Sequence, residues 1–145
     1  MKKQILIGVI CGLLILLFLY ASVSKLAHLG ALRHDMYNQP FPRWLASILI
    51  WAIPITEIVI ALGLIPDRTR KYALWLALIL MSLFTLYGAA ILLHLFPYVP
   101  CSCGGVLRNL TWEQHLFFNL FFVAVAITGI VSLKKENVPM DTVSL

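Results

Sequence analysis

The sequence predicts an all-α protein, an integral membrane bundle of four helices, and three observations support this fold class. Of the 145 residues, 61% are hydrophobic and only 12% are charged. A soluble domain of this size needs a larger charged share to cover its surface. The apolar residues fall into four stretches, each long enough to cross a hydrocarbon core about 30 Å thick. Only short loops remain between them, so we expect a single domain over residues 1–145.

The first predicted span covers residues 4–24. Two lysines precede its apolar run, a pattern shared with secretory signal peptides. The hydrophobic part of a signal peptide is about 7–15 residues long, whereas the run from Ile5 to Tyr20 is longer. We therefore expect a retained helix. The polar and aromatic stretch 25–43 follows, and part of it should lie as an amphipathic helix at the bilayer surface.

The second and third spans are predicted over residues 44–65 and 72–96. Trp44 marks the start of the second span, because Trp is enriched where membrane helices meet water. Pro97 marks the end of the third span, because proline cannot continue a helix. Pro54 lies within the second span, where it is expected to kink the helix.

The fourth span is predicted over residues 115–133. The sequence Thr111-Trp112-Glu113-Gln114 precedes it and has the form of a capping box. In that motif the Thr111 side chain bonds the Gln114 amide while the Gln114 side chain reaches back to the Thr111 amide. The helix should therefore begin close to Thr111.

The basic residues predict the orientation of the bundle in the membrane. Seven lysines and arginines fall on one side of the four spans and four fall on the other. The positive-inside rule then places both termini in the cytoplasm and the loop after the third span outside, on the periplasmic side of a bacterial inner membrane. The formal charge of +5 comes from helix ends and forms no patch, so no nucleic acid partner is expected; the lipid bilayer is the expected surrounding. The seven are Lys2, Lys3, Arg68, Arg70, Lys71, Lys134 and Lys135, and the four are Lys25, Arg33, Arg43 and Arg108.

Cys101 and Cys103 are the leading candidates for chemistry. They stand one residue apart in the predicted periplasmic loop, after Pro100 and before Gly104-Gly105. Prolines and glycines suit a tight bend, and a disulfide closing so small a ring would be strained and readily exchanged. The periplasm is oxidising, so the pattern favours a redox role. A static loop staple and a metal site completed by a histidine are the alternatives.

Glu57 is the second candidate, because an ionisable side chain within an apolar span is costly unless it faces the bundle and finds a partner. One interpretation is a proton relay or a cofactor contact. The other is a polar clamp between helices, with Ser82, Thr85 or Tyr87 as hydrogen-bond donors.

His115 and Asn119 stand four residues apart at the start of the fourth span, hence on one helix face. His115 should lie near the membrane surface on the side of the cysteine loop, where it could move a proton or favour a thiolate. The alternative is an interface histidine without a chemical role. The third cysteine, Cys11, lies in the first span and is expected to be a buried small side chain. Lesser candidates at the same surface are His94, Ser24, Lys25 and Trp112.

These features together resemble a known family. Ser24-Lys25-Leu26, and Ile53-Pro54 with Glu57, resemble the DoxX-like superfamily of small four-helix membrane proteins. The loop Pro100-Cys101-Ser102-Cys103-Gly104-Gly105, followed by Leu110-Thr111-Trp112, resembles its MauE-type branch, the methylamine utilisation proteins. The resemblance covers nearly the whole chain.

The resemblance implies a role in the maturation of exported proteins, as MauE is linked to disulfide formation in the small subunit of methylamine dehydrogenase. It implies a thioredoxin-like periplasmic partner or an exported thiol protein as substrate. By analogy with other four-helix thiol-oxidising membrane proteins, a quinone held near Glu57 would be the electron carrier. The competing hypotheses are a non-catalytic membrane scaffold with a structural Cys101–Cys103 staple, and a metal-binding membrane protein or transporter. Whether the chain is itself a thiol-disulfide oxidoreductase component stays open at this point.

Overall fold

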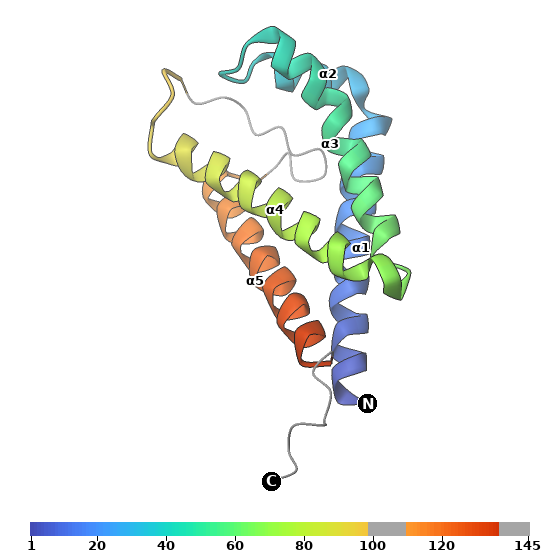
Figure 1. Ribbon diagram of the computed structural model, residues 1–145. Helices are drawn as coiled ribbons and strands as arrows, with labels where there is room; N and C mark the ends of the chain where they lie inside the picture. The colour runs from blue at the N-terminus through green and yellow to red at the C-terminus, as the bar shows by residue number, and fades with distance from the viewer. Residues whose placement is uncertain (99–109, 137–145) are drawn as a thin grey trace.

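The computed structural model describes residues 1–98 and 110–136, and within these ranges the chain is helical with no strand. Four long helices form the bundle, and the short helix α2 lies against α3 and α1 at one end of it (Figure 1). The N-terminus and the last turn of α5 lie at one end of the bundle, and α2 lies at the other (Figure 1). We call these the turn end, which contains the α3–α4 turn, and the α2 end. The helices are α1 (Lys2–Ala27), α2 (Leu29–Tyr37), α3 (Arg43–Gly63), α4 (Asp67–Leu92) and α5 (Trp112–Glu136).

Helices α1, α3, α4 and α5 are each long and apolar enough to cross a membrane. Many of their large apolar side chains are exposed, among them Leu16, Ile55, Leu86 and Phe117. A water-soluble protein does not expose so large an apolar surface, so these faces suit a bilayer. The prediction of a multi-pass helical membrane protein is confirmed. Which side of the membrane each end faces stays a prediction.

The short helix α2 lies within residues 25–43, where a helix was expected, and its position at the bilayer surface stays a prediction. It buries Leu32 and Met36, which pack with Ala46 and Ile50 of α3. The chain then passes Pro42, which has extended backbone and precedes α3. Helix α2 therefore closes one end of the bundle through an apolar contact of its own.

The main core is packed at the turn end. Leu14, Ile60, Leu64 and Leu74 are completely shielded there and come from three different helices. At Gly129 of α5 the neighbouring helices approach closely, because a Cβ added at this position would lie 3.1 Å from Ile10 and 3.2 Å from Leu74. Small residues permit such approach between membrane helices.

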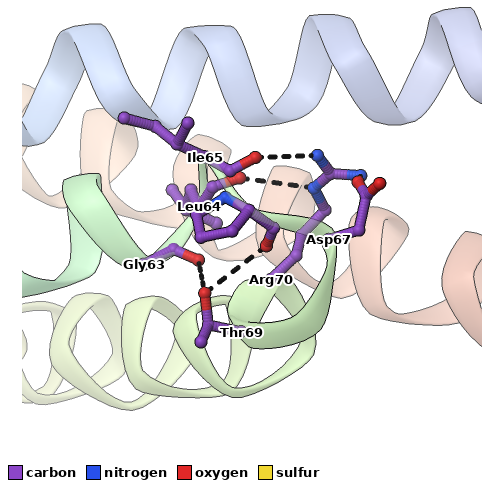
Figure 2. A network of polar contacts seen from close by, with 7 residues as sticks. Gly63, Leu64, Ile65, Asp67, Thr69 and Arg70 are labelled. Carbon is purple, nitrogen blue, oxygen red and sulfur yellow. Dashed lines mark hydrogen bonds and ion pairs between the residues drawn. The ribbon is translucent and has the colours of Figure 1, made fainter.

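The α3–α4 turn is held by two side chains of α4 that bond carbonyls at the end of α3 and just after it (Figure 2). Arg70 donates from Nε to Leu64 O at 3.3 Å and from Nη2 to Ile65 O at 3.2 Å. Thr69 Oγ1 donates to Gly63 O at 2.7 Å. These bonds satisfy carbonyls that a helix end leaves without partners. They also explain why α4 begins at Asp67, earlier than the predicted residue 72.

Helix α4 ends at Leu92, four residues before the predicted end at 96. His94 has a positive φ of 56°, its N–H donates to Ile91 O, and the Leu95 N–H donates to Ala90 O. This is the Schellman arrangement, which glycine usually supplies. Nothing in the sequence indicated this helix end, because histidine rarely adopts the left-handed conformation. The prediction relied on Pro97 instead, which lies five residues after the helix ends.

Candidate functional site

A buried ion pair joins α1 to α3 at the α2 end of the bundle. Lys25 Nζ donates to Glu57 Oε1 at 2.7 Å, and the two side chains are 11% and 2% exposed. Glu57 is thus the interhelical contact that sequence analysis described, but the expected donors were wrong. Thr85 donates to Met81 O in its own helix, and Tyr87 donates to Gln39. A charged partner fits better than a hydroxyl, because a buried carboxylate needs its charge balanced.

The pairing depends on how far α3 extends beyond α1. Lys25 lies in the last turn of α1, whereas Glu57 lies in the second half of α3. At 1.5 Å per residue, Glu57 is about 20 Å along the helix axis from Arg43. Because α2 separates the two helices in the chain, α3 begins well past the end of α1 (Figure 1). This stagger brings Glu57 level with Lys25.

The second carboxylate oxygen, Glu57 Oε2, is buried and has no hydrogen-bond partner among residues 1–98 and 110–136. Leaving a buried charged oxygen unsatisfied costs roughly 1–3 kcal/mol or more. Residues that only stabilise a fold rarely carry such a cost, whereas binding sites often do. Glu57 is therefore better explained as part of a site than as a clamp alone.

A cavity of about 380 Å³ adjoins this pair and is lined by side chains from all five helices. Its walls are mainly apolar and aromatic, with a few polar groups at the ion pair and at the start of α5. This is the usual composition of a small-molecule site in a protein. The lining residues are Leu17, Phe18, Tyr20, Ala21, Lys25, Leu32, Met36, Ile53, Glu57, Met81, Phe84, Tyr87, Gly88, Trp112, His115, Phe118 and Asn119.

His115 and Asn119 both line the cavity, as their shared helix face predicted. The capping box that positions them is confirmed. The Thr111 N–H donates to Gln114 Oε1 at 3.0 Å, and the Gln114 N–H donates to Thr111 Oγ1 at 3.3 Å. Because this cap fixes the first turn of α5, it also fixes where Trp112 and His115 meet the cavity.

Tyr87 and Gln39 connect α4 to the chain after α2. The Tyr87 hydroxyl donates to Gln39 Oε1, and Gln39 Nε2 donates to Asp35 O at 3.2 Å. Gln39 is buried, and the Tyr87 ring packs against Phe41 and Trp112. Sequence analysis missed Gln39; a polar residue beside two prolines in a loop gives no sign of burial. This contact holds α2 across the α2 end of the cavity.

Comparison with known proteins identifies the family to which this architecture belongs. The family model described as methylamine utilisation protein MauE matches residues 3–132. The chain belongs to the MauE family. The match covers most of each membrane helix and the connection between α4 and α5, so the predicted resemblance to the MauE-type proteins is confirmed. Membership of the DoxX-like superfamily stays a prediction. No curated protein and no solved structure matches the chain.

In this MauE-family chain the predicted thiol pair, Cys101 and Cys103, lies outside the residues that the structure describes. In sequence it falls between α4 and α5. Tyr87 and Gly88 near the end of α4, and Trp112 and His115 at the start of α5, line the cavity. In the sequence, the segment that carries both thiols therefore connects two helices that both line the cavity. Cys11, in contrast, is buried within α1, as expected.

Proposed function

We propose that this MauE-family membrane protein transfers electrons between thiols and disulfides and so supports disulfide formation in exported proteins. Cys101 and Cys103 are the exchanging pair, on the periplasmic side of a bacterial inner membrane, and both termini are cytoplasmic. The observation that carries the proposal is the arrangement at the α2 end. A cavity with a buried ion pair and His115 is lined by residues of α4 and α5, the two helices between which both cysteines fall in the sequence. The family description associates the chain with methylamine utilisation.

The thiol step is an exchange with a partner protein. A thiolate of a thioredoxin-like protein, or of an exported protein, attacks the Cys101–Cys103 disulfide and forms a mixed disulfide. The partner's second thiolate then displaces the cysteine of this chain. The partner leaves with a new disulfide, and Cys101 and Cys103 are left as two thiols. The partner has lost two electrons and two protons, and this chain has gained them.

The thiol pair must then pass the two electrons and two protons to a second carrier, since each exchange leaves it reduced. A membrane quinone supplies this chemistry when bound, because it accepts both and leaves as a hydroquinone. The cavity fits such a group in volume, in its apolar and aromatic walls, and in the polar groups of Lys25 and Glu57. In this proposal His115 moves protons between the thiol segment and the cavity that it lines.

The proposal is tested by trapping the thiol exchange in living cells. Acid quenching followed by a maleimide gel shift reports the redox state of Cys101 and Cys103 in the unmodified protein. Cys101→Ser and Cys103→Ser are compared, because each keeps one thiol that can attack the disulfide of an oxidised partner in the reverse of this exchange. The mixed disulfide should then accumulate, because the second cysteine of the pair is missing and cannot release the partner. Cys11→Ser is the matched control. It should remove only the maleimide that labels Cys11, and it should leave the redox state of Cys101 and Cys103 and the trapping of the partner unchanged.

The expected result is a mixture of reduced and oxidised protein, with one variant holding a partner that mass spectrometry identifies. A pair that is wholly oxidised, resists mild reductant and traps nothing in either variant would overturn the proposal. That outcome would instead support the scaffold with a structural staple.

A further inference from the structure

Both members of the ion pair line the cavity, and both have hydrogen-bonding capacity that the described residues do not use. Glu57 Oε2 is an acceptor with no partner among the described residues. An ammonium group carries three N–H donors, and Lys25 uses one of them on Glu57 Oε1. A ligand that meets both groups should therefore donate a hydrogen bond to Glu57 and accept one from Lys25. A hydroxyl does both, whereas a carbonyl oxygen can only accept.

The charge of the site limits the ligand further. Lys25 and Glu57 together are neutral, and the remaining walls are mainly apolar. A carboxylate or an ammonium ligand would bring an unbalanced charge into the membrane interior, which is costly. The site therefore favours a neutral ligand over a fatty acid or an amine.

The shape of the site favours a flat head group. Phe84, Tyr87, Trp112 and Phe118 contribute aromatic walls. A dry apolar cavity of about 150 Å³ is large enough to bind benzene. The 380 Å³ available here would take a substituted ring and the first part of an apolar tail.

We infer that this cavity binds an alkyl or isoprenoid hydroquinone, whose hydroxyl donates to Glu57 Oε2 and accepts from Lys25 Nζ. The inference rests on the proposed function for its physiological meaning, because it names the reduced form of the second carrier as the preferred ligand. The oxidised form, with carbonyl oxygens in place of hydroxyls, keeps the contact with Lys25 but leaves Glu57 Oε2 without a donor.

Binding is measured on the full chain carrying Cys101→Ser and Cys103→Ser, so that no thiol chemistry interferes. The protein is held in lipid nanodiscs under anaerobic conditions and titrated with a short-tailed 1,4-benzohydroquinone or with its quinone. A hydrogen bond to a charged group contributes about 1.5–3 kcal/mol, so the hydroquinone should bind at least about tenfold more tightly. A fatty alcohol and a fatty acid of matched tail length should bind weakly.

Glu57→Gln tests the direction of the hydrogen bond. The amide keeps the shape of the carboxylate but can place an N–H donor where Oε2 stood, so the preference should move toward the quinone. Circular dichroism checks that the variant keeps its helix content, and size-exclusion chromatography checks that its nanodiscs elute at the same volume as those of the wild type. The inference is wrong if the wild type and Glu57→Gln prefer hydroquinone over quinone by the same factor. It is also wrong if the fatty alcohol binds as tightly as the hydroquinone.

Gly88→Leu supplies a test that does not alter the ion pair. Gly88 is buried and lines the cavity, and a Cβ added there meets no atom of the described residues within 4 Å. A leucine should therefore occupy the cavity and abolish hydroquinone binding. Gly8→Leu is the matched control, because Gly8 is exposed on α1 and away from the cavity, and a Cβ there is equally unobstructed. Unchanged binding in Gly88→Leu would overturn the inference.

The two proposals can fail separately. Loss of partner trapping with hydroquinone binding intact would refute the thiol exchange alone. Intact trapping with no hydroquinone binding would refute the ligand alone.

Discussion

The two ends of the bundle differ in how their interiors are filled. At the turn end, Leu14, Leu64 and Leu74 are fully shielded, and Gly129 lets the helices meet closely. At the α2 end, the helices surround a cavity that contains an ion pair and a carboxylate oxygen with no partner among the described residues. Close packing stabilises a bundle, whereas a cavity and a buried charge lower its stability. In our proposal the turn end holds the fold together and the α2 end carries the proposed function.

The largest expected effect is at the ion pair. Glu57→Ala leaves Lys25 without its partner in a buried site, and breaking such a pair costs about 3–5 kcal/mol. The matched change at the turn end is Asp67→Ala, which removes the partner of Arg70. Asp67 is highly exposed, so that change should cost less than about 1 kcal/mol. Free energies of unfolding in detergent measure both.

Replacing both residues of the ion pair separates the effect on ligand binding from the effect on the free energy of unfolding. Replacing both partners by apolar residues, Lys25→Met with Glu57→Leu, should recover most of the stability lost in Glu57→Ala, because no buried charge then remains. It should not recover hydroquinone binding. Equal costs for Glu57→Ala and Asp67→Ala would contradict the contrast between the two ends.

A smaller effect is expected when the same glycine substitution is made at each end. Gly129→Leu forces a side chain against Ile10 and Leu74, and overpacking of this kind costs about 1–3 kcal/mol. Gly88→Leu enters the cavity instead, where an added Cβ has no side chain of the described residues within 4 Å, so it should be much less destabilising than Gly129→Leu. Thermal unfolding of the two variants provides the comparison. If Gly88→Leu is as destabilising as Gly129→Leu, the α2 end is packed as tightly as the turn end.

The smallest effect is expected at the cap of α5. Thr111→Ala removes the side-chain acceptor for the Gln114 N–H, a loss of about 0.5–2 kcal/mol. Hydrogen exchange should show faster opening in the first turn of α5, next to Trp112. Thr111→Ser keeps the hydroxyl and should behave as wild type. Equal exchange in the alanine and serine variants would show that the cap does not hold this turn.

The sequence predicted the features that depend on local pattern. Hydropathy identified the four membrane helices, and the capping box at Thr111 and Gln114 was found because its residues stand three positions apart. The cavity face of α5 followed from the spacing of His115 and Asn119. Each of these depends on neighbours within a turn or on the composition of one segment.

The features that the sequence did not predict depend on how distant segments are placed. Glu57 and Lys25 were both named as candidates, but their pairing was not predicted, because it requires α3 to extend past α1. The burial of Gln39, which accepts a hydrogen bond from Tyr87 of α4, depends in the same way on distant segments meeting. Nor did the sequence indicate a left-handed backbone at His94, because glycine is the usual residue there.

The most direct test of the account asks whether the thiol pair turns over through the cavity. The full chain is reconstituted in lipid vesicles with a short-tailed quinone and a dithiol peptide, and peptide disulfide and hydroquinone are both measured. We predict that wild type and Gly8→Leu form one hydroquinone for each peptide disulfide over many turnovers. Gly88→Leu should oxidise one equivalent of peptide and then stop. Sustained turnover in Gly88→Leu at the wild-type rate would contradict the account.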